Sequence, residues 1–179
     1  DGGTSKWEAT GGIRIANSSY WEIRNLEIRD SPYKGINIYG DSEAHYNVIE
    51  DVEVHHNNLP GVHISGNAKH NVLRSVVSHD NYDFQNSGGN ADGIQISGGE
   101  ATDNQVIKCV SYANSDDGFD FWEATDNHIY RSIAYDNGRD EGNGNGFKLG
   151  GGDNSGRQEV VRCIAYQNRA RGFDHNGAN

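Results

Sequence analysis

The sequence predicts an all-β fold, a parallel β-helix of about seven stacked coils. Three observations predict it: a polar composition rich in turn residues, a glycine-led strand that recurs along the chain, and a second recurring strand that ends at asparagine. Only 34% of the 179 residues are hydrophobic, while 24 are glycine and two are proline. This is too polar for a helical bundle, and the three tryptophans, nine tyrosines and five phenylalanines are unlike a disordered chain.

The first repeat is a glycine followed by an apolar residue, any residue and a second apolar residue. Copies recur about every 26 residues, which is the spacing expected of a solenoid coil. A single copy has too little apolar surface to fold alone, so the copies must stack. The repeat begins at Gly12, Gly35, Gly61, Gly93, Gly118, Gly146 and, in a degraded copy, Gly172.

The second repeat is a short β-branched strand that lies between the glycine-led strands, as in "VIEDVEVHHN" and "VIKCVSYAN". Asparagine recurs at its end, and we expect a ladder of amide hydrogen bonds between stacked turns there. A leucine-rich repeat is the alternative solenoid, but leucine is scarce. The predicted ladder consists of Asn57, Asn81, Asn114, Asn137 and Asn168.

The two cysteines occupy the same repeat position two coils apart, with Ser132 between them. Cys109 and Cys163 should therefore be separated by about twice the strand spacing, beyond the ~7 Å that a disulfide spans between Cα atoms. We predict two free thiols.

Stacking also places distant polar residues together. The position two residues after the glycine is expected to point outward, away from the flanking apolar residues. In this alignment four aspartates form one patch on two adjacent coils, a lysine lies directly over one of them, and two further polar residues lie beside the lysine. The aspartates are Asp92, Asp116, Asp117 and Asp120, the lysine is Lys148, and the neighbours are Asn145 and Arg171.

Four carboxylates this close repel one another unless some are protonated or a cation binds. Hard oxygen ligands in this number suit Ca²⁺, and the carbonyl of Gly118 is a further candidate ligand. Lys148 lies in an open, glycine-rich frame, "GNGNGFKLGGG", and is the candidate base. Bound Ca²⁺ and Arg171 would lower the pKa of Lys148, whereas the aspartates alone would raise it.

The formal net charge is −11, and no apolar run approaches the about 18 residues of a membrane-spanning helix. We therefore expect no nucleic-acid partner and no membrane partner, because phosphate binding needs a basic surface. The eight histidines have no metal-ligand spacing and are predicted to be surface or turn residues. We expect one domain over residues 1–179, processed or trimmed at its "DGGTSKWEAT" start and part of a longer β-helix.

Three motifs resemble the family 9 polysaccharide lyases, which include pectate lyases: "NADGI" (90–94), "NSDDGFDFW" (114–122) and "GNGNGFKLGG" (142–151). The similarity extends from about residue 90 to 176, the expected catalytic region. It implies a right-handed β-helix and Ca²⁺-assisted β-elimination on a uronate polymer. Asp92, Asp116, Asp117 and Asp120 would ligate Ca²⁺, and Lys148 would be the Brønsted base.

The column alignment adds Arg171, or else Arg139, as a clamp for a neighbouring substrate carboxylate, and Asn145 as a further substrate contact. We expect a secreted, extracellular or periplasmic, bacterial protein that acts as a monomer on an acidic polysaccharide.

Two other functions remain open at this point. A polygalacturonase-like glycoside hydrolase would use the aspartates as acid and base without a metal, but its Gly-His-Gly and Arg-x-Lys signatures are absent from the sequence. A non-catalytic carbohydrate-binding or adhesin module would use calcium only to stiffen the coil.

Overall fold

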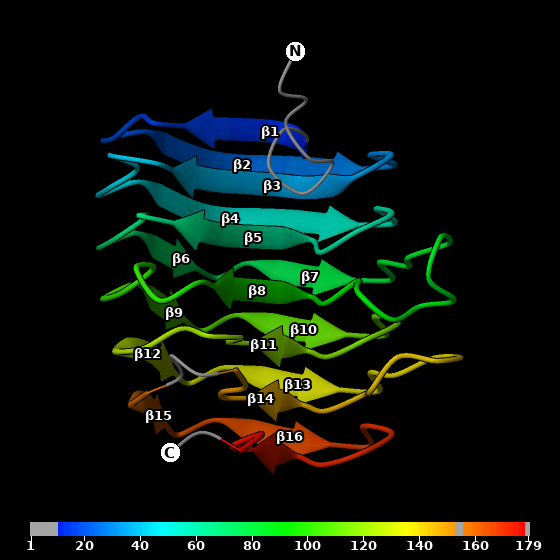
Figure 1. Cartoon of the computed structure of the whole chain (residues 1–179). Coiled ribbons are helices and arrows are strands. Elements are labelled where there is room, and N and C mark those ends of the chain that lie inside the picture. Colours follow the sequence, from blue (N-terminus) through cyan, green and yellow to red (C-terminus); the bar gives the residue numbers. More distant parts are fainter. Residues whose placement is uncertain (1–10, 153–155, 178–179) are drawn as a thin grey trace.

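The stacked coils are present in the computed structural model, which describes residues 11–152 and 156–177. The described residues form strands, turns and loops but no helix, and every strand pairing is parallel. The "DGGTSKWEAT" start and the predicted domain boundaries at residues 1 and 179 lie outside the described residues. Figure 1 shows the coils stacked from the N-terminal to the C-terminal end.

The glycine-led strands form one seven-stranded sheet, which confirms the predicted number of coils. Its order is β1-β3-β5-β8-β11-β14-β17, so each strand pairs with its equivalent one coil away. The strands are β1 (Gly11–Ala16), β3 (Lys34–Gly40), β5 (Val62–Gly66), β8 (Ile94–Ser97), β11 (Phe119–Asp120), β14 (Phe147–Lys148) and β17 (Phe173–Asp174).

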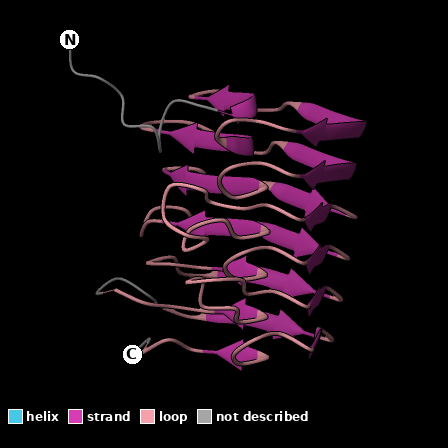
Figure 2. Cartoon of the chain, turned by 90° about the vertical axis from the view of Figure 1, so that its right-hand side faces the viewer, coloured by secondary structure: helices cyan, strands magenta, loops and turns pink. Residues whose placement is uncertain are grey.

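The second repeat forms a ten-stranded sheet in which the long strands β2 (Glu22–Arg29) and β4 (Val48–His55) pair with each other. Later coils divide this long strand in two, and Figure 2 shows the resulting regular stack of coils from the side. The shorter strands are β6 (Val72–Arg74), β7 (Val77–His79), β9 (Gln105–Ile107), β10 (Val110–Tyr112), β12 (Asn127–Tyr130), β13 (Ile133–Tyr135), β15 (Gln158–Val161) and β16 (Ile164–Tyr166).

The core consists of inward-facing columns of like residues. Phe119, Phe147 and Phe173 stack with ring centroids 4.6 and 4.8 Å apart, and β-branched Ile94 and Val62 occupy the same column in earlier coils. The repeat glycine is required where coils approach closely: a β-carbon on Gly118 would lie 2.6 Å from the carbonyl oxygen of Gly146. Close backbone approach therefore explains the glycine at this turn.

The predicted asparagine ladder is confirmed. Asn81 Nδ2 donates to Asn114 Oδ1 at 2.8 Å, and Asn114 Nδ2 donates to Asn137 Oδ1 at 3.0 Å. Asn57 and Asn168 extend this ladder at its two ends.

A second ladder, which the sequence analysis missed, lies at the opposite end of the ten-stranded sheet. Its signal was an amide residue at the start of these strands or directly before it, as in "NVIE" and "NVLR". Both ladders satisfy turn amides that have no strand partner. The second ladder consists of Asn47, Asn71, Asn104, Asn127 and Gln158.

Two further predictions concern side chains at repeat positions. Cys109 and Cys163 are free, and the backbone amide of Cys109 donates to Ser132 Oγ at 3.1 Å, which confirms the register. The outward-pointing column is exposed at Arg14, but four of its later side chains are buried: Asn37, His63, Asp120 and Lys148. Thus His63 is 6% exposed and lies 2.7 Å from Ser97 Oγ. The prediction of surface histidines is wrong for His63 and for His79, which is also buried.

The ladder should contribute strongly to stability. We expect Asn114→Ala to lower the free energy of unfolding by about 2–3 kcal/mol, because it leaves the buried backbone amide of Asn81 without an acceptor and takes one of two acceptors from Asn81 Nδ2. Urea denaturation followed by circular dichroism would measure the loss. The control is Gln105→Ala, which removes an exposed side-chain amide from β9; an equal loss in both variants would contradict a special contribution of the ladder.

Candidate active site

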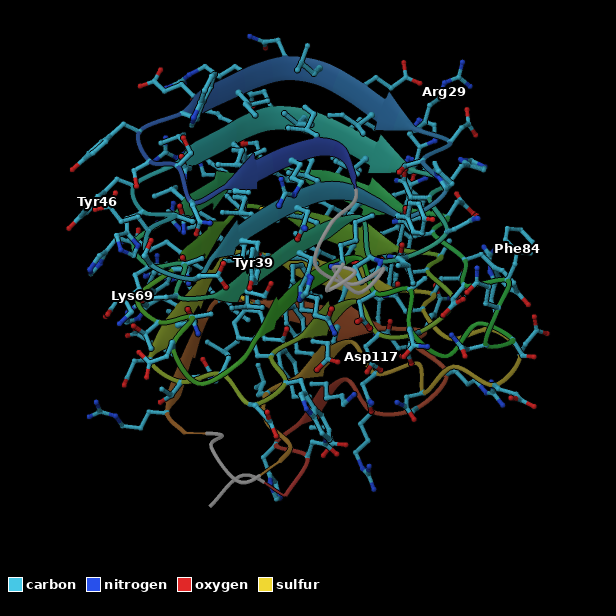
Figure 3. The ribbon with its side chains drawn as sticks, turned by 45° about the horizontal axis from the view of Figure 1, so that its top comes forward. Arg29, Tyr39, Tyr46, Lys69, Phe84 and Asp117 are labelled. Carbon is cyan, nitrogen blue, oxygen red and sulfur yellow. The ribbon has the colours of Figure 1, made fainter. Side chains whose placement is uncertain are left out.

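Three aspartates meet on the seven-stranded sheet just before strands β8 and β11. Carboxylate oxygens of Asp92, Asp116 and Asp117 all lie within 4.8 Å of one another, and all three side chains are buried. The alignment by repeat position is confirmed here, since Gly93 N donates to Asp117 O at 3.0 Å. Figure 3 marks Asp117 on the coil.

Each aspartate is held by a backbone amide of the following coil. Asp117 N donates to Asp92 Oδ1 at 3.0 Å, and Asn143 N donates to Asp116 Oδ1 at 2.6 Å. Asn145 donates to Asp117 Oδ1 from both its backbone N, at 2.6 Å, and its Nδ2, at 3.0 Å. One oxygen of each carboxylate is thus anchored, and the second is left for another partner.

Lys148 lies directly beside Asp120 across the β11–β14 pairing. Its Nζ is 3.1 Å from Asp120 Oδ2 and 3.2 Å from Asp117 Oδ2. The glycine-rich sequence predicted an open setting for the Lys148 side chain. This prediction is wrong, because Lys148 is only 7% exposed. Neighbouring side chains on the same face cover it: Trp122 places its ring centroid 5.3 Å from Nζ.

The four aspartates and Lys148 shift one another's pKa values, because four buried carboxylates surround one ammonium group. Burial raises the pKa of Asp92 well above its usual range, and repulsion from Asp120, Asp116 and Asp117 raises it further. Burial raises the pKa of Asp116 to about 6, with repulsion from Asp117, and that of Asp120 to about 7 despite Lys148. For Lys148, burial lowers the pKa, but the carboxylates of Asp120 and Asp117 outweigh it and raise the pKa, as predicted without a metal.

The donor set fits a divalent cation. All ligand atoms are hard carboxylate oxygens, as Ca²⁺ prefers. Two buried oxygens are left under-satisfied: Asp120 Oδ1 accepts no hydrogen bond, and Asp117 Oδ2 has only its ion pair with Lys148 Nζ. Buried carboxylates without donors are costly, and a bound cation would satisfy them.

Three other predicted site residues have partners in the structure that differ from the predicted roles. Asn145 is buried and uses its amide to hold Asp117, while its Oδ1 accepts from Arg171 N at 3.3 Å. The structure does not bring the Gly118 carbonyl to the cluster, because it already accepts hydrogen bonds from Ile94 N and Ser111 Oγ. Asp120 lies outside the close group of three and pairs with Lys148 instead.

The two candidate arginines differ in position. Arg171 Nη1 pairs with Asp174 Oδ2 at 2.8 Å, and its side chain is 71% exposed, so it stays available on the face that carries the aspartates. Arg139 lies close to the cluster in its backbone, since its N donates to the carbonyl of Ser115 at 2.8 Å. Its side chain is directed elsewhere, to Asp80 at 3.0 Å and to a groove that Phe84 also lines.

Trp122 was not singled out by sequence reasoning although it ends the "NSDDGFDFW" motif. It lies two residues after Asp120 and is 41% exposed beside Lys148. The two-residue alternation of a strand was the available signal, since it puts residues 120 and 122 on one face. An exposed indole here can stack on a sugar ring.

Comparison with known proteins agrees with this geometry. The family model described as "Pel9A-like, right handed beta helix region" matches residues 2–179, and the chain belongs to this family. Pectate lyase L of Dickeya dadantii is 31% identical over 96% of this chain and 41% of its own length. Pectate lyase PEL9 of Emericella nidulans is 30% identical over 92% of this chain and 46% of its own length.

Among solved structures, the crystal structure of pectate lyase Pel9A superposes with a TM-score of 0.87 at 29% identity, over 98% of this chain and 46% of that chain. The predicted resemblance to family 9 lyases is confirmed, and so is the right-handed β-helix. The chain spans less than half the length of these relatives.

The raised pKa values make stability depend on pH. Without added metal, burial raises the pKa of Asp116 to about 6 and that of Asp120 to about 7 in the folded protein, whereas an aspartate of the unfolded chain has its ordinary pKa of 3.8. Their contribution to the free energy of unfolding therefore falls as the pH rises from 4 to 7. We expect Asp116→Asn to stabilise the protein by about 2 kcal/mol at pH 7.5 and by little at pH 4.

Urea denaturation in EDTA at both pH values would measure this difference. Asp51→Asn, at an exposed aspartate outside the cluster, is the matched control. A stability change in Asp116→Asn that does not vary with pH would contradict the prediction.

Proposed function

We propose that this chain is the catalytic part of a secreted, calcium-dependent pectate lyase-like enzyme that cleaves a uronate polymer by β-elimination. The observation that carries the proposal is one buried lysine that contacts two aspartates of an acidic cluster with unsatisfied oxygens. Membership of the Pel9A-like family supports the reaction class. We place the catalytic region at about residues 90–176.

In this mechanism Asp92, Asp116 and Asp117 would hold the cation, and the free Oδ1 of Asp120 would be the further ligand. Asn145 and the Asn143 amide keep the carboxylates in place while charge builds on the substrate. A bound Ca²⁺ would neutralise the uronate carboxylate and stabilise the negative charge that develops on it in the transition state.

Lys148 is the group positioned to take the proton. In a uronate the C5 hydrogen is α to the carboxylate. Lys148 removes this proton, the C5–H electron pair forms the C4–C5 double bond, and the C4–O bond breaks with its electron pair on the glycosidic oxygen, which then takes a proton. Lys148 must be neutral to do this, so its ion pairs with Asp117 and Asp120 have to weaken first.

Substrate would be held beside these groups by exposed side chains on the same face. Arg171 has donors for a neighbouring carboxylate, in exchange for its pair with Asp174. Asn145 is a further predicted contact. Trp122 offers an exposed ring next to Lys148.

The base can be tested without removing the buried charge. Lys148→Arg keeps a cation next to Asp117 and Asp120, but a guanidinium is not deprotonated in proteins. We expect the rate of formation of the ultraviolet-absorbing unsaturated product from polygalacturonate to fall by about 10²- to 10⁴-fold, with an unchanged melting temperature. Lys69→Arg, an exposed lysine paired with Glu100, is the control and should keep full activity. Wild-type rates in Lys148→Arg would exclude Lys148 as the base.

The cation can be tested by binding as well as by activity. EDTA should abolish product formation and added Ca²⁺ should restore it, while Ca²⁺ should raise the melting temperature of wild type and much less that of Asp92→Asn. Isothermal titration calorimetry with Ca²⁺ would give the binding directly. Cleavage that survives EDTA and yields no unsaturated product would instead favour a glycoside hydrolase.

The substrate should be identified by a screen of polygalacturonate, methylated pectin, alginate and glycosaminoglycans with and without Ca²⁺. Calcium binding without product from any of these polymers would favour a carbohydrate-binding module with a structural calcium.

A further inference from the structure

A second surface with an unusual composition lies on the ten-stranded sheet, away from the aspartates. Where the short strands β9, β12 and β15 turn into β10, β13 and β16, one residue per coil has a positive φ. These residues are Lys108, Arg131 and Arg162, and all three side chains are exposed. Figure 1 shows these strand pairs one above another in the last coils.

The three cations form a column. The amide of Lys108 donates to the carbonyl of Tyr130, and that of Arg131 donates to the carbonyl of Val161, both at 2.9 Å, so successive bends are in register. Coils repeat at roughly 4.7–4.9 Å along the stack. None of the three side chains has an ion pair with a carboxylate of the described residues, although most other lysines and arginines there do.

Local backbone preference does not explain these residues. A positive φ is most easily adopted by glycine, asparagine or aspartate, and the earlier coils have Asn25 and Asp51 at the equivalent bend. Long cationic side chains in three consecutive coils replace those residues at a conformational cost.

The neighbouring columns change in the same coils. Glu27 and Glu53 lie beside the bend in the early coils, and at this position the later coils have Val110, Ile133 and Ile164. The cations therefore border apolar side chains rather than acids. A groove of about 380 Å³ is lined by Ile107, Lys108, Tyr130, Arg131, Val161 and Arg162.

Carboxylates limit this surface on both sides. Glu159 lies on one flank, bonded to Tyr130 and His128, and the exposed Asp136 lies on the other. A broad anionic surface such as a membrane would meet these acids. A narrow polymer with one line of negative charges would meet only the column of cations and the apolar groove beside it.

From this arrangement we infer that the groove beside Lys108, Arg131 and Arg162 is a second, non-catalytic binding site for an anionic polysaccharide chain that runs along the stack of coils. A uronan has one carboxylate per sugar, so carboxylates spaced along one chain can pair with cations that repeat along the stack. The C–H surfaces of the sugars would lie on Ile107, Tyr130 and Val161. The choice of a uronan as ligand rests on the proposed function.

Binding should be measured under conditions that silence the aspartate site. The Lys148→Ala variant in EDTA would be titrated with polygalacturonate by affinity electrophoresis and calorimetry. We expect saturable binding that weakens as NaCl is raised, because the pairs are exposed. Adding Lys108→Gln, Arg131→Gln and Arg162→Gln should weaken it by about tenfold, and Arg131→Gln alone should give a partial loss.

The matched control carries Arg29→Gln, Lys69→Gln and Arg157→Gln, which remove the same charge from other exposed positions. This control should lose no more than about twofold in affinity. Equal losses in both triple variants, equal affinity for polyglutamate, or no binding of polygalacturonate in EDTA would overturn the inference.

The lyase proposal and the second binding site can be tested independently of each other. With Lys148 intact, the Lys108, Arg131 and Arg162 triple variant should cleave short galacturonate oligomers at the wild-type rate, since none of these residues touches the aspartate cluster. Loss of cleavage of short oligomers in this variant would overturn the assignment of a purely binding role. Absence of cleavage in the wild-type protein would contradict the lyase and leave the binding measurement in EDTA valid.

Discussion

The alignment of each coil with the next is the constraint on which this structure depends. Parallel strand pairing sets the spacing, but short strands such as β11 and β14, with two residues each, contribute few hydrogen bonds of their own. Two ladders of buried amides supply what these strands lack, because each asparagine bonds to the backbone and side chain of its neighbour. A slip of one residue would break both ladders and turn apolar side chains outward.

The same register produces the repulsion between buried carboxylates in the candidate active site. Asp117 lies next to Asp92, and Lys148 next to Asp120, only because equivalent positions of adjacent coils stack on each other. Carboxylates that would be harmless on a surface are brought together in a buried group, where burial and mutual repulsion raise their pKa values. The rigid scaffold makes such a group tolerable, and a cation or a proton relieves it. The column of cations on the ten-stranded sheet, Lys108, Arg131 and Arg162, arises from the same stacking.

Several features could be predicted because a solenoid converts sequence spacing into spatial neighbourhood. The glycine repeat was enough to align Asp92, Asp116, Asp117 and Lys148, and the free state of Cys109 and Cys163 followed from the same alignment. Burial could not be predicted in this way. Lys148 was expected in an open frame, yet packing against Trp122 and two aspartates covers it, because the repeat says nothing about how side chains on one face lean over each other.

The sequence by itself determined the fold, the number of coils and which polar residues share a column, since all three follow from repeat length and strand alternation. Only the tertiary structure decided what each polar group does within its column. In the structure the Asn145 amide donates a hydrogen bond to Asp117, and Asp120 forms an ion pair with Lys148. The Gly118 carbonyl accepts hydrogen bonds from Ile94 N and Ser111 Oγ. The physical reason is that hydrogen-bond direction and burial depend on distances of a few tenths of an ångström, which a repeat pattern does not contain.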